Sequence, residues 1–371
     1  MERIRSKAIQ SAFAVILLSL FVSCQKEVAK TPATEGEIAT KAIPSKDLKD
    51  FTQVNLVGDN DEYNPAHIDP NLINGWGISF PSSGPAWVSS EGAGLSVIYT
   101  GDGSTARPPV VIPPAGSAPS SHPTGQVFNP TTDFKLPNGN PARFIFATAE
   151  GGVSGWNTGN NAVRMINDPG DAYLGIALAA DGGNNFLYVA NFSEGEIEVF
   201  DKNWAEVEGK EFDDPDIPAG YSPFNIQAID GKLYVMYAKV NPEEGEEEPG
   251  PGLGFVDIFN PNGTLVKRFI SNGQLNAPWG IAKAPIGFWG EGSENTNVFL
   301  VGNFGDGRIN AFDEDGNFLG QLRQHGNPII IEGLWGIAFA PSTSTALNRN
   351  WLFFAAGPDD EEHGLFGYIK K

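Results

Sequence analysis

The sequence contains a single cysteine, Cys24, and few basic side chains for its length. It has 24 lysine and arginine residues against 45 aspartate and glutamate residues, and the formal net charge of the 371-residue chain is −21. The absence of cysteine after position 24 excludes disulfide bonds and thiolate metal sites from the rest of the chain. Because affinity for nucleic acid depends on clustered lysine and arginine, we expect no nucleic-acid partner.

The apolar run nearest the N-terminus has the pattern of an export signal. Three basic residues among the first seven positions precede Ala12–Val22, which is too short for a comfortable transmembrane helix. Ser23 and Cys24 follow at once, an arrangement similar to a bacterial lipoprotein signal, although Phe21 stands where such signals usually have leucine. We expect cleavage before Cys24 and lipidation of its thiol. The alternative is an ordinary signal peptide that is discarded together with its cysteine.

This signal predicts a protein of the cell envelope of a Gram-negative bacterium, anchored in the membrane through the lipid on Cys24. The anchor would lie in the outer membrane, on its periplasmic or its surface-exposed face. Residues 24–50 are poor in aromatic side chains and rich in Lys, Glu, Thr, Ala and Pro, so they predict a flexible tether. We therefore divide the chain into a signal peptide (1–23), a tether (24–50) and a folded domain (51–371).

Six strand starts marked by glycine or asparagine divide the folded domain into units of similar length. They are spaced by 48, 50, 50, 55 and 56 residues, and they are Gly77, Gly125, Gly175, Asn225, Gly280 and Gly336. A period of about 40 to 50 residues, with each unit built from short strands, is typical of a β-propeller. The sequence therefore predicts an all-β, monomeric six-bladed β-propeller with four strands per blade.

The sixth unit provides only three strands before the chain stops. The segment Phe51–Val57 precedes the first blade and has no other strand to pair with. Because an open sheet edge would break the ring, we expect Phe51–Val57 to form the outer strand of the last blade.

The chain from about Phe51 to Lys371 resembles an uncharacterised bacterial class of secreted six-bladed β-propellers related to NHL-repeat proteins. The segments that carry this resemblance are His67–Phe80, Pro123–Asn129, Ala142–Asn157, Tyr221–Lys239, Leu275–Ala282, Leu300–Asp313 and Ala356–Gly367. The resemblance implies a propeller fold and export, and it implies no established activity.

In a propeller, the starts of the innermost strands and the ends of the next strands converge at one mouth of the channel. Polar and aromatic residues at these positions are our candidates for ligand binding. They are Trp76, Glu91, Asn191, Asn225, Lys239, Trp279, Asn303, Trp335 and Asp359. The three tryptophans occupy one repeat position, directly before glycine, where they either pack between blades or stack on a ligand.

Oxygen-rich side chains at this mouth suit a hard cation, and calcium is the candidate cofactor. The set resembles that of gluconolactonase-like propellers, in which a metal polarises a lactone carbonyl. The candidate metal ligands are Glu150, Asn191, Asn225 and Asn303. Asparagine is also a common turn residue, so a purely structural role stays open for Asn191 and Asn303.

Catalytic residues are less clearly marked than ligand residues. The candidates are His67, Asp69, Glu150 and His363. His67 and Asp69 would meet His363 at the mouth if the N-terminal strand closes blade six, and a His–Asp acid/base pair would then be available; the alternative is that these residues cap loops or form hydrogen bonds across the closure. We expect no set of serine, histidine and aspartate that could act as a nucleophilic triad.

Two functions follow from these observations. The first is a lipid-anchored extracytoplasmic binding or interaction module for a glycan, a peptide or an envelope protein. The second is a calcium-dependent hydrolase or lyase that acts at the same mouth. The acidic run Pro242–Pro249 is either a solvated loop or part of a cation site.

Overall fold

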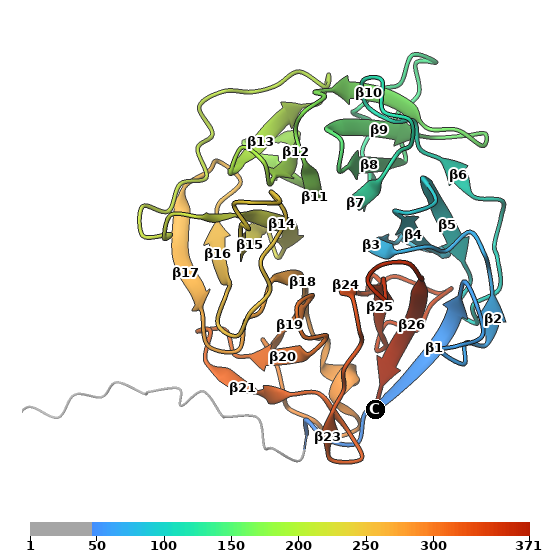
Figure 1. Cartoon of the computed structure of the whole chain (residues 1–371), viewed down its shortest axis with the longest axis vertical. Helices are drawn as coiled ribbons and strands as arrows, with labels where there is room; N and C mark the ends of the chain where they lie inside the picture. Colours follow the sequence, from blue (N-terminus) through green and yellow to red (C-terminus); the bar gives the residue numbers. More distant parts are fainter. Residues whose placement is uncertain (1–46) are drawn as a thin grey trace, which may run out of the picture. The chain divides into compact units, whose positions relative to one another are not determined.

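The computed structural model describes residues 47–371. The expected signal peptide, the lipidated Cys24 and most of the expected tether lie outside the described residues. The described part is almost entirely β-structure, with six antiparallel blades around a central axis (Figure 1). No helix among residues 47–371 is both long and apolar enough to cross a membrane.

The first three blades follow one another along the chain. Blade one contains β3 (Gly75–Ser79), β4 (Ala86–Ser90), β5 (Leu95–Tyr99) and β6 (Val110–Val111). Blade two contains β7 (Pro123–Phe128), β8 (Phe144–Thr148), β9 (Gly152–Trp156) and β10 (Val163–Asn167). Blade three contains β11 (Tyr173–Asp181), β12 (Asn184–Asn191) and β13 (Glu196–Asp201). Its fourth segment runs beside β13 through a bridge between Phe200 and Glu206.

The next two blades are followed by the one that closes the ring. Blade four contains β14 (Tyr221–Ile229), β15 (Lys232–Lys239), β16 (Phe255–Phe259) and β17 (Leu265–Ser271). Blade five contains β18 (Pro278–Lys283), β19 (Phe299–Asn303), β20 (Ile309–Phe312) and β21 (Phe318–Gln321). A single 3-10 turn, η1 (Ile286–Trp289), follows β18, and the short hairpin β22 (Arg323–Gln324) and β23 (Asn327–Pro328) follows β21. Blade six contains β24 (Leu334–Phe339), β25 (Leu352–Ala356) and β26 (Leu365–Lys370).

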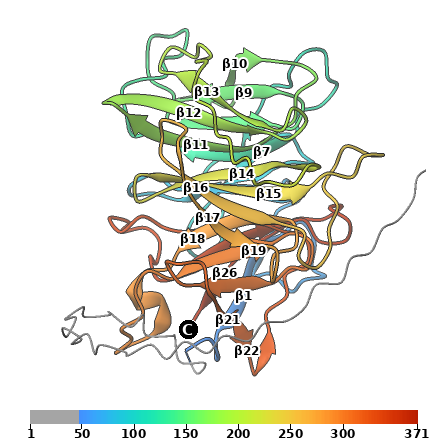
Figure 2. The ribbon, with the colours of Figure 1, turned by 90° about the vertical axis from the view of Figure 1, so that its left-hand side faces the viewer.

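The N-terminal strand closes the last blade, as the sequence predicted. Strand β1 (Thr52–Gly58) pairs antiparallel with β26, from Thr52 opposite Lys370 to Gly58 opposite Leu365. The two strands lie side by side in both views (Figures 1 and 2). The short strand β2 (His67–Ile68) adds to the outer edge of β1 in parallel. The observed strand is displaced by one residue from the predicted segment.

The repeated glycines lie where neighbouring inner strands touch at the axis. A Cβ atom on Gly77 would lie 2.6 Å from the carbonyl oxygen of Thr124, and one on Gly125 would lie 2.8 Å from the backbone nitrogen of Ile176. No side chain fits at such distances, which explains why glycine recurs at this position. Asn225 breaks the series, and its amide donates to the carbonyl of Trp279 in the next blade at 2.8 Å.

Large apolar side chains fill the axis on the face where the inner strands start. One cluster around the axis includes Trp76, Leu174, Phe224, Trp279 and Trp335. The other clusters lie between and within blades, where strands of neighbouring blades face each other. At the opposite ends of the inner strands the centre is hollow, with cavities of about 900 Å³ and about 390 Å³.

Candidate functional site at the channel mouth

The three repeat-position tryptophans pack against one another beneath the predicted mouth. Trp76 stacks on Trp335 with ring centroids 3.4 Å apart, and Trp279 meets both rings edge-on at 5.7 and 6.0 Å. Their exposed fractions are 6%, 3% and 1% for Trp76, Trp279 and Trp335. This aromatic plug, defined here as the three tryptophans, makes a rigid apolar floor instead of an open platform.

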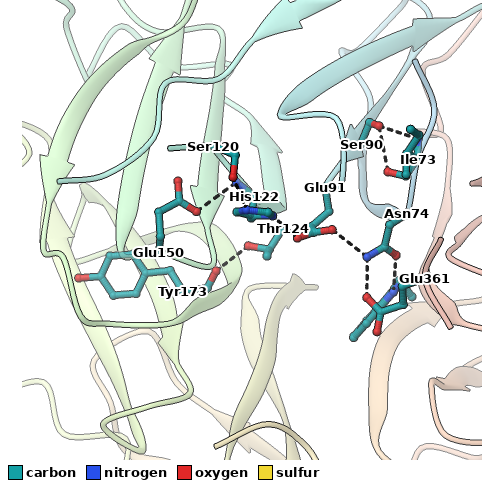
Figure 3. A network of polar contacts seen from close by, with 11 residues as sticks. Ile73, Asn74, Ser90, Glu91, Ser120, His122, Thr124, Glu150, Tyr173 and Glu361 are labelled. Carbon is teal, nitrogen blue, oxygen red and sulfur yellow. Dashed lines mark hydrogen bonds and ion pairs between the residues drawn. The ribbon is translucent and has the colours of Figure 1, made fainter. Parts of the chain in front are cut away.

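Asn74, at the end of the loop into β3, collects two carboxylates above this floor (Figure 3). Its Nδ2 donates to Glu91 Oε2 at 2.9 Å and to Glu361 Oε2 at 2.5 Å. Its Oδ1 accepts from Trp335 Nε1 at 3.1 Å, so every polar atom of the amide has a partner. Asn74 is 1% exposed and adopts a φ of +50°. The amide therefore joins blades one and six to the floor of the mouth.

The other oxygen of Glu91 continues the network into blade two (Figure 3). Glu91 Oε1 lies 2.6 Å from His122 Nδ1, and His122 Nε2 lies 2.8 Å from Ser120 Oγ. The backbone N–H of His122 donates to Glu150 Oε2 at 3.1 Å. The side chains of Glu91 and His122 are 19% and 39% exposed, so solvent reaches this part of the network.

The acidic loop between β15 and β16 approaches the same carboxylates. Burial raises the pKa of Glu361 to about 7, helped by the charges of Glu91 and Glu246. Burial likewise raises the pKa of Glu247 to about 8, helped by the charges of Glu361 and Glu246. The loop is also tied back by a Lys239–Glu248 ion pair of 2.6 Å. The charges of loops from blades one, four and six thus interact at this mouth.

Glu361 belongs to a turn with an uncommon backbone. Asp359, Asp360 and Glu361 have φ values of +57°, +50° and +67° in succession. Each non-glycine residue in this region costs on the order of 1 kcal/mol or more. The turn directs Glu361 to Asn74, whereas the Asp359 side chain is 66% exposed at the rim.

A second carboxylate group lies between blades two and three. One carboxylate oxygen from each of Asp168, Asp171 and Glu198 lies within 4.8 Å of the other two. Among the described residues, this is the cluster that could hold a cation. The Tyr173 hydroxyl lies 2.6 Å from Glu198 Oε2 and 3.0 Å from Asp168 Oδ2. Burial raises the pKa of Glu198, and the adjacent carboxylates add to the effect of burial in raising that of Tyr173. Asn191 donates to Glu198 Oε1 at 2.6 Å.

The four predicted metal ligands take part in separate hydrogen bonds. Glu150 bonds to backbone N–H groups of His122 and Ala115, and Asn191 bonds to Glu198. Asn225 bonds to the Trp279 carbonyl, and Asn303 donates to the carbonyl of Gln274 at 2.8 Å and to Asp306 at 3.0 Å. Of the four predicted ligands, Asn191 is the one that contacts the three carboxylates between blades two and three, through its bond to Glu198.

The predicted acid/base residues also have distinct partners. His67 Nε2 lies 3.0 Å from the carbonyl oxygen of Asp102, and Asp69 accepts from the Tyr99 hydroxyl at 2.9 Å. His363 Nδ1 lies 2.8 Å from Asp59, which raises the pKa of the imidazole. His67 and His363 are thus held by different loops around the closing strand.

One arrangement was not expected from the sequence. The expectation concerned serine, histidine and aspartate, and the structure brings Ser120, His122 and a glutamate, Glu91, to hydrogen-bond distance. The acid comes from the loop after β4 in blade one, while the other two residues precede β7 in blade two. The sequence signal is the short Ser-x-His spacing; its acidic partner is identifiable only from the packing of neighbouring blades.

The ring of six antiparallel blades, closed by the N-terminal strand, defines the chain as a six-bladed β-propeller. The chain is 35% identical over 335 residues to "Uncharacterized protein R648" of Acanthamoeba polyphaga mimivirus, covering 86% of this chain and 80% of that protein. It is 33% identical over 337 residues to "Uncharacterized protein L690" of the same virus, covering 86% of each. The chain belongs to the family that contains these two proteins.

No protein-family model matches the chain. The mimivirus relatives lend no support to the bacterial part of the resemblance seen in the sequence, whereas its propeller part is confirmed. A solved streptogramin B lyase has a TM-score of 0.50 at 13% identity, covering 86% of this chain and 97% of the lyase. A Bacteroides thetaiotaomicron protein of unknown function also has a TM-score of 0.50, at 10% identity, covering 81% of this chain and 70% of that one. These two structures share the fold.

Proposed function

We propose that the chain is a binding or interaction module whose mouth holds a cationic group of a partner peptide or protein. The observation that supports this most is the position of Glu361 beside Glu91 on the Asn74 amide. With its pKa raised to about 7, the ionised form of Glu361 is disfavoured until a positive charge approaches. An ammonium or guanidinium group at this position would relieve the repulsion between the carboxylates.

The surroundings of Asn74 favour recognition by a preformed site. The indole N–H of Trp335 holds the Asn74 amide from below, and the stacked rings of the aromatic plug form the floor. A rigid floor reduces the entropy that a ligand must overcome on binding. Glycans and envelope proteins, the other partners expected from the sequence, stay predictions, and a basic peptide segment is the ligand that the charge of this mouth favours.

The test is a fluorescence titration of the full chain with a lysine-rich peptide at several pH values. Because deprotonated Glu361 is the binding form, we expect affinity to rise as the pH increases from about 6 to 8. Glu361→Gln should weaken binding by about tenfold, the equivalent of about 1.4 kcal/mol. The neighbouring Glu362→Gln is the control, because Glu362 is exposed and its side chain lies outside the network. Equal affinity of the two variants would contradict the proposal.

A calcium-dependent hydrolase or lyase is the second candidate function. The residues best placed to hold a cation are Asp168, Asp171 and Glu198. Of these, Glu198 accepts a hydrogen bond from the predicted ligand Asn191. Oxygen ligands of this kind suit calcium, which would polarise a substrate carbonyl. The calcium titration described in the Discussion tests this candidate.

The anchoring of the module is a separate part of the proposal. We propose that Cys24 carries a lipid that tethers the propeller to a membrane outside the cytoplasm, in the cell envelope. Mass spectrometry of the N-terminal peptide of the mature protein tests this. A lipid-modified Cys24 is expected, and an unprocessed N-terminus, or a mature chain that starts after Cys24, would refute it.

A further inference from the structure

The contacts of His122 distinguish it from His67 and His363. Its Nδ1 lies 2.6 Å from a carboxylate oxygen of Glu91, and its Nε2 lies 2.8 Å from the hydroxyl of Ser120. Because a carboxylate can only accept, Nδ1 carries a proton, and in the neutral imidazole Nε2 accepts the proton of the serine hydroxyl. This is the order of groups that activates a serine as a nucleophile.

A purely structural role does not account for both contacts. His67 holds its loop through one contact to a main-chain carbonyl, and His363 has carboxylates near both ring nitrogens. Among residues 47–371, no hydroxyl lies within hydrogen-bond distance of either ring. His122 alone of these three lies between an acid and a hydroxyl, and its position is fixed through the backbone instead. Its N–H donates to Glu150, and its carbonyl accepts from Ala149 at 2.9 Å.

The acid of this set is itself held in place. Asn74, which is 1% exposed, donates to the second oxygen of Glu91 at 2.9 Å. That leaves Glu91 Oε1 directed to the imidazole (Figure 3). Ser120 is exposed, and the His122 side chain is 39% exposed, so a substrate in solvent reaches both. The positions of base and acid are therefore preorganised, while the nucleophile is open to solvent.

We propose that Ser120, His122 and Glu91 form a hydrolytic site for carboxylic esters, in addition to the binding role of the mouth. Ser120 is the nucleophile and His122 the general base, both catalytic residues, and Glu91 is a positioning residue that keeps the proton on Nδ1. The carboxylates of Glu150 and Glu361 on either side disfavour anionic esters, so neutral and cationic esters are the substrate class.

The reaction balances with water as the only co-reactant. The Ser120 proton passes to His122 Nε2 as Oγ forms a bond to the ester carbonyl carbon. The C–O bond to the alcohol then breaks, and the alcohol leaves with the proton from Nε2. Water next gives a proton to Nε2 and its oxygen attacks the acyl carbon. The bond to Oγ breaks, Ser120 regains its proton, and a carboxylic acid is released.

The first measurement is covalent labelling of the full chain with a fluorophosphonate probe, read by peptide mass spectrometry. We expect an adduct on Ser120 that is lost in Ser120→Ala and reduced at least tenfold in His122→Gln, since the base activates the hydroxyl. Ser117→Ala is the matched control, because Ser117 is an exposed serine of the same loop. Absence of the adduct, or labelling of Ser120 that does not depend on His122, would overturn the proposal.

The second measurement is hydrolysis of p-nitrophenyl acetate, with circular dichroism to show that each variant is folded. Ser120→Ala should abolish turnover, and Ser117→Ala should leave it unchanged. Glu91→Gln should lower kcat by about 10- to 100-fold with little change in KM, and Glu91→Asp should restore part of it. A Glu91→Gln variant that changes KM alone would remove Glu91 from the set. Because labelling of Ser120 needs no cationic ligand, its outcome is independent of the peptide titration proposed above.

Discussion

Replacing Glu361 with glutamine should change how the stability of the propeller depends on pH. Burial and the charges of Glu91 and Glu246 raise the pKa of Glu361 from 4.5 to about 7. A raised pKa means that the folded state binds the proton more tightly than the unfolded state does. The contribution of Glu361 to the free energy of unfolding is therefore greatest below about pH 4.5, falls as the pH rises, and levels off above about pH 7.

The size of this fall follows from the pKa change. Each pKa unit corresponds to about 1.4 kcal/mol, so the shift of Glu361 corresponds to roughly 3 kcal/mol. Solvent at the partly exposed side chain screens some of this, leaving a fall of about 1–3 kcal/mol. Glutamine keeps an oxygen that accepts from Asn74 but cannot ionise. Glu361→Gln should therefore match the wild type at about pH 4.5 and exceed its stability by about 1–3 kcal/mol at about pH 8.

The assay is urea unfolding followed by tryptophan fluorescence at a series of pH values. The aromatic plug provides the signal because its three tryptophans are buried together. Glu362→Gln is the control for loss of a negative charge in the same turn, and it should parallel the wild type. Glu247, whose pKa is raised to about 8, keeps a pH dependence of its own in the variant. Parallel curves for wild type and Glu361→Gln would refute the assigned environment of Glu361.

Three further predictions test the ring and its cations. Gly175→Ala should lower the free energy of unfolding by about 1–3 kcal/mol or more, because the new Cβ would lie 2.2 Å from Asn225 Oδ1; an unchanged melting temperature would contradict the close contact. Deleting Phe51–Val57 should abolish cooperative thermal unfolding, because β26 would lose its partner strand, and intact unfolding would contradict the closure. Calcium at about 100 times its dissociation constant should stabilise the wild type over EGTA by about 2.7 kcal/mol, but not Glu198→Gln. Equal melting temperatures of the wild type in calcium and EGTA would remove the calcium-dependent function.

The ring could be predicted from the sequence because its repeat has a steric cause. Inner strands touch at Gly77, Gly125 and Gly175, so the sequence returns to glycine at this position in every blade except the fourth, which has Asn225. The closing strand was predictable for a related reason, since a blade with three strands leaves an edge that a ring must fill. Blade three departs slightly from the prediction, because its outermost segment has a bridge at Glu206 in place of a regular strand.

The polar contacts at the mouth could not be predicted in the same way. The pairing of Asn74 with Glu361 joins residues 287 positions apart, and it exists because the ring brings blade six against blade one. His122 meets Glu91 across the junction of two blades. The sequence places these side chains at one end of the ring, but it does not say which of them touch. Asn225 and Asn303 show the opposite case, in which residues of suitable chemistry donate to backbone carbonyls.

The aromatic plug explains why polar chemistry at this face lies at the junctions between blades. Trp76, Trp279 and Trp335 pack against one another at the axis. The hydrogen bonds of Glu91 are made beside them, where the loops of blade one pass those of blades six and two. Glu91 belongs to two such junctions, because one oxygen faces Asn74 and the other faces His122.

A cation bound beside Glu361 would affect both contacts of Glu91, the one with Asn74 and the one with His122. Drawing Glu91 toward the ligand would weaken its contact with His122, so ligand binding and serine activation would oppose each other. A bound basic peptide should therefore slow the labelling of Ser120 by the fluorophosphonate probe. Independence of the two would mean that Glu91 serves only one of them.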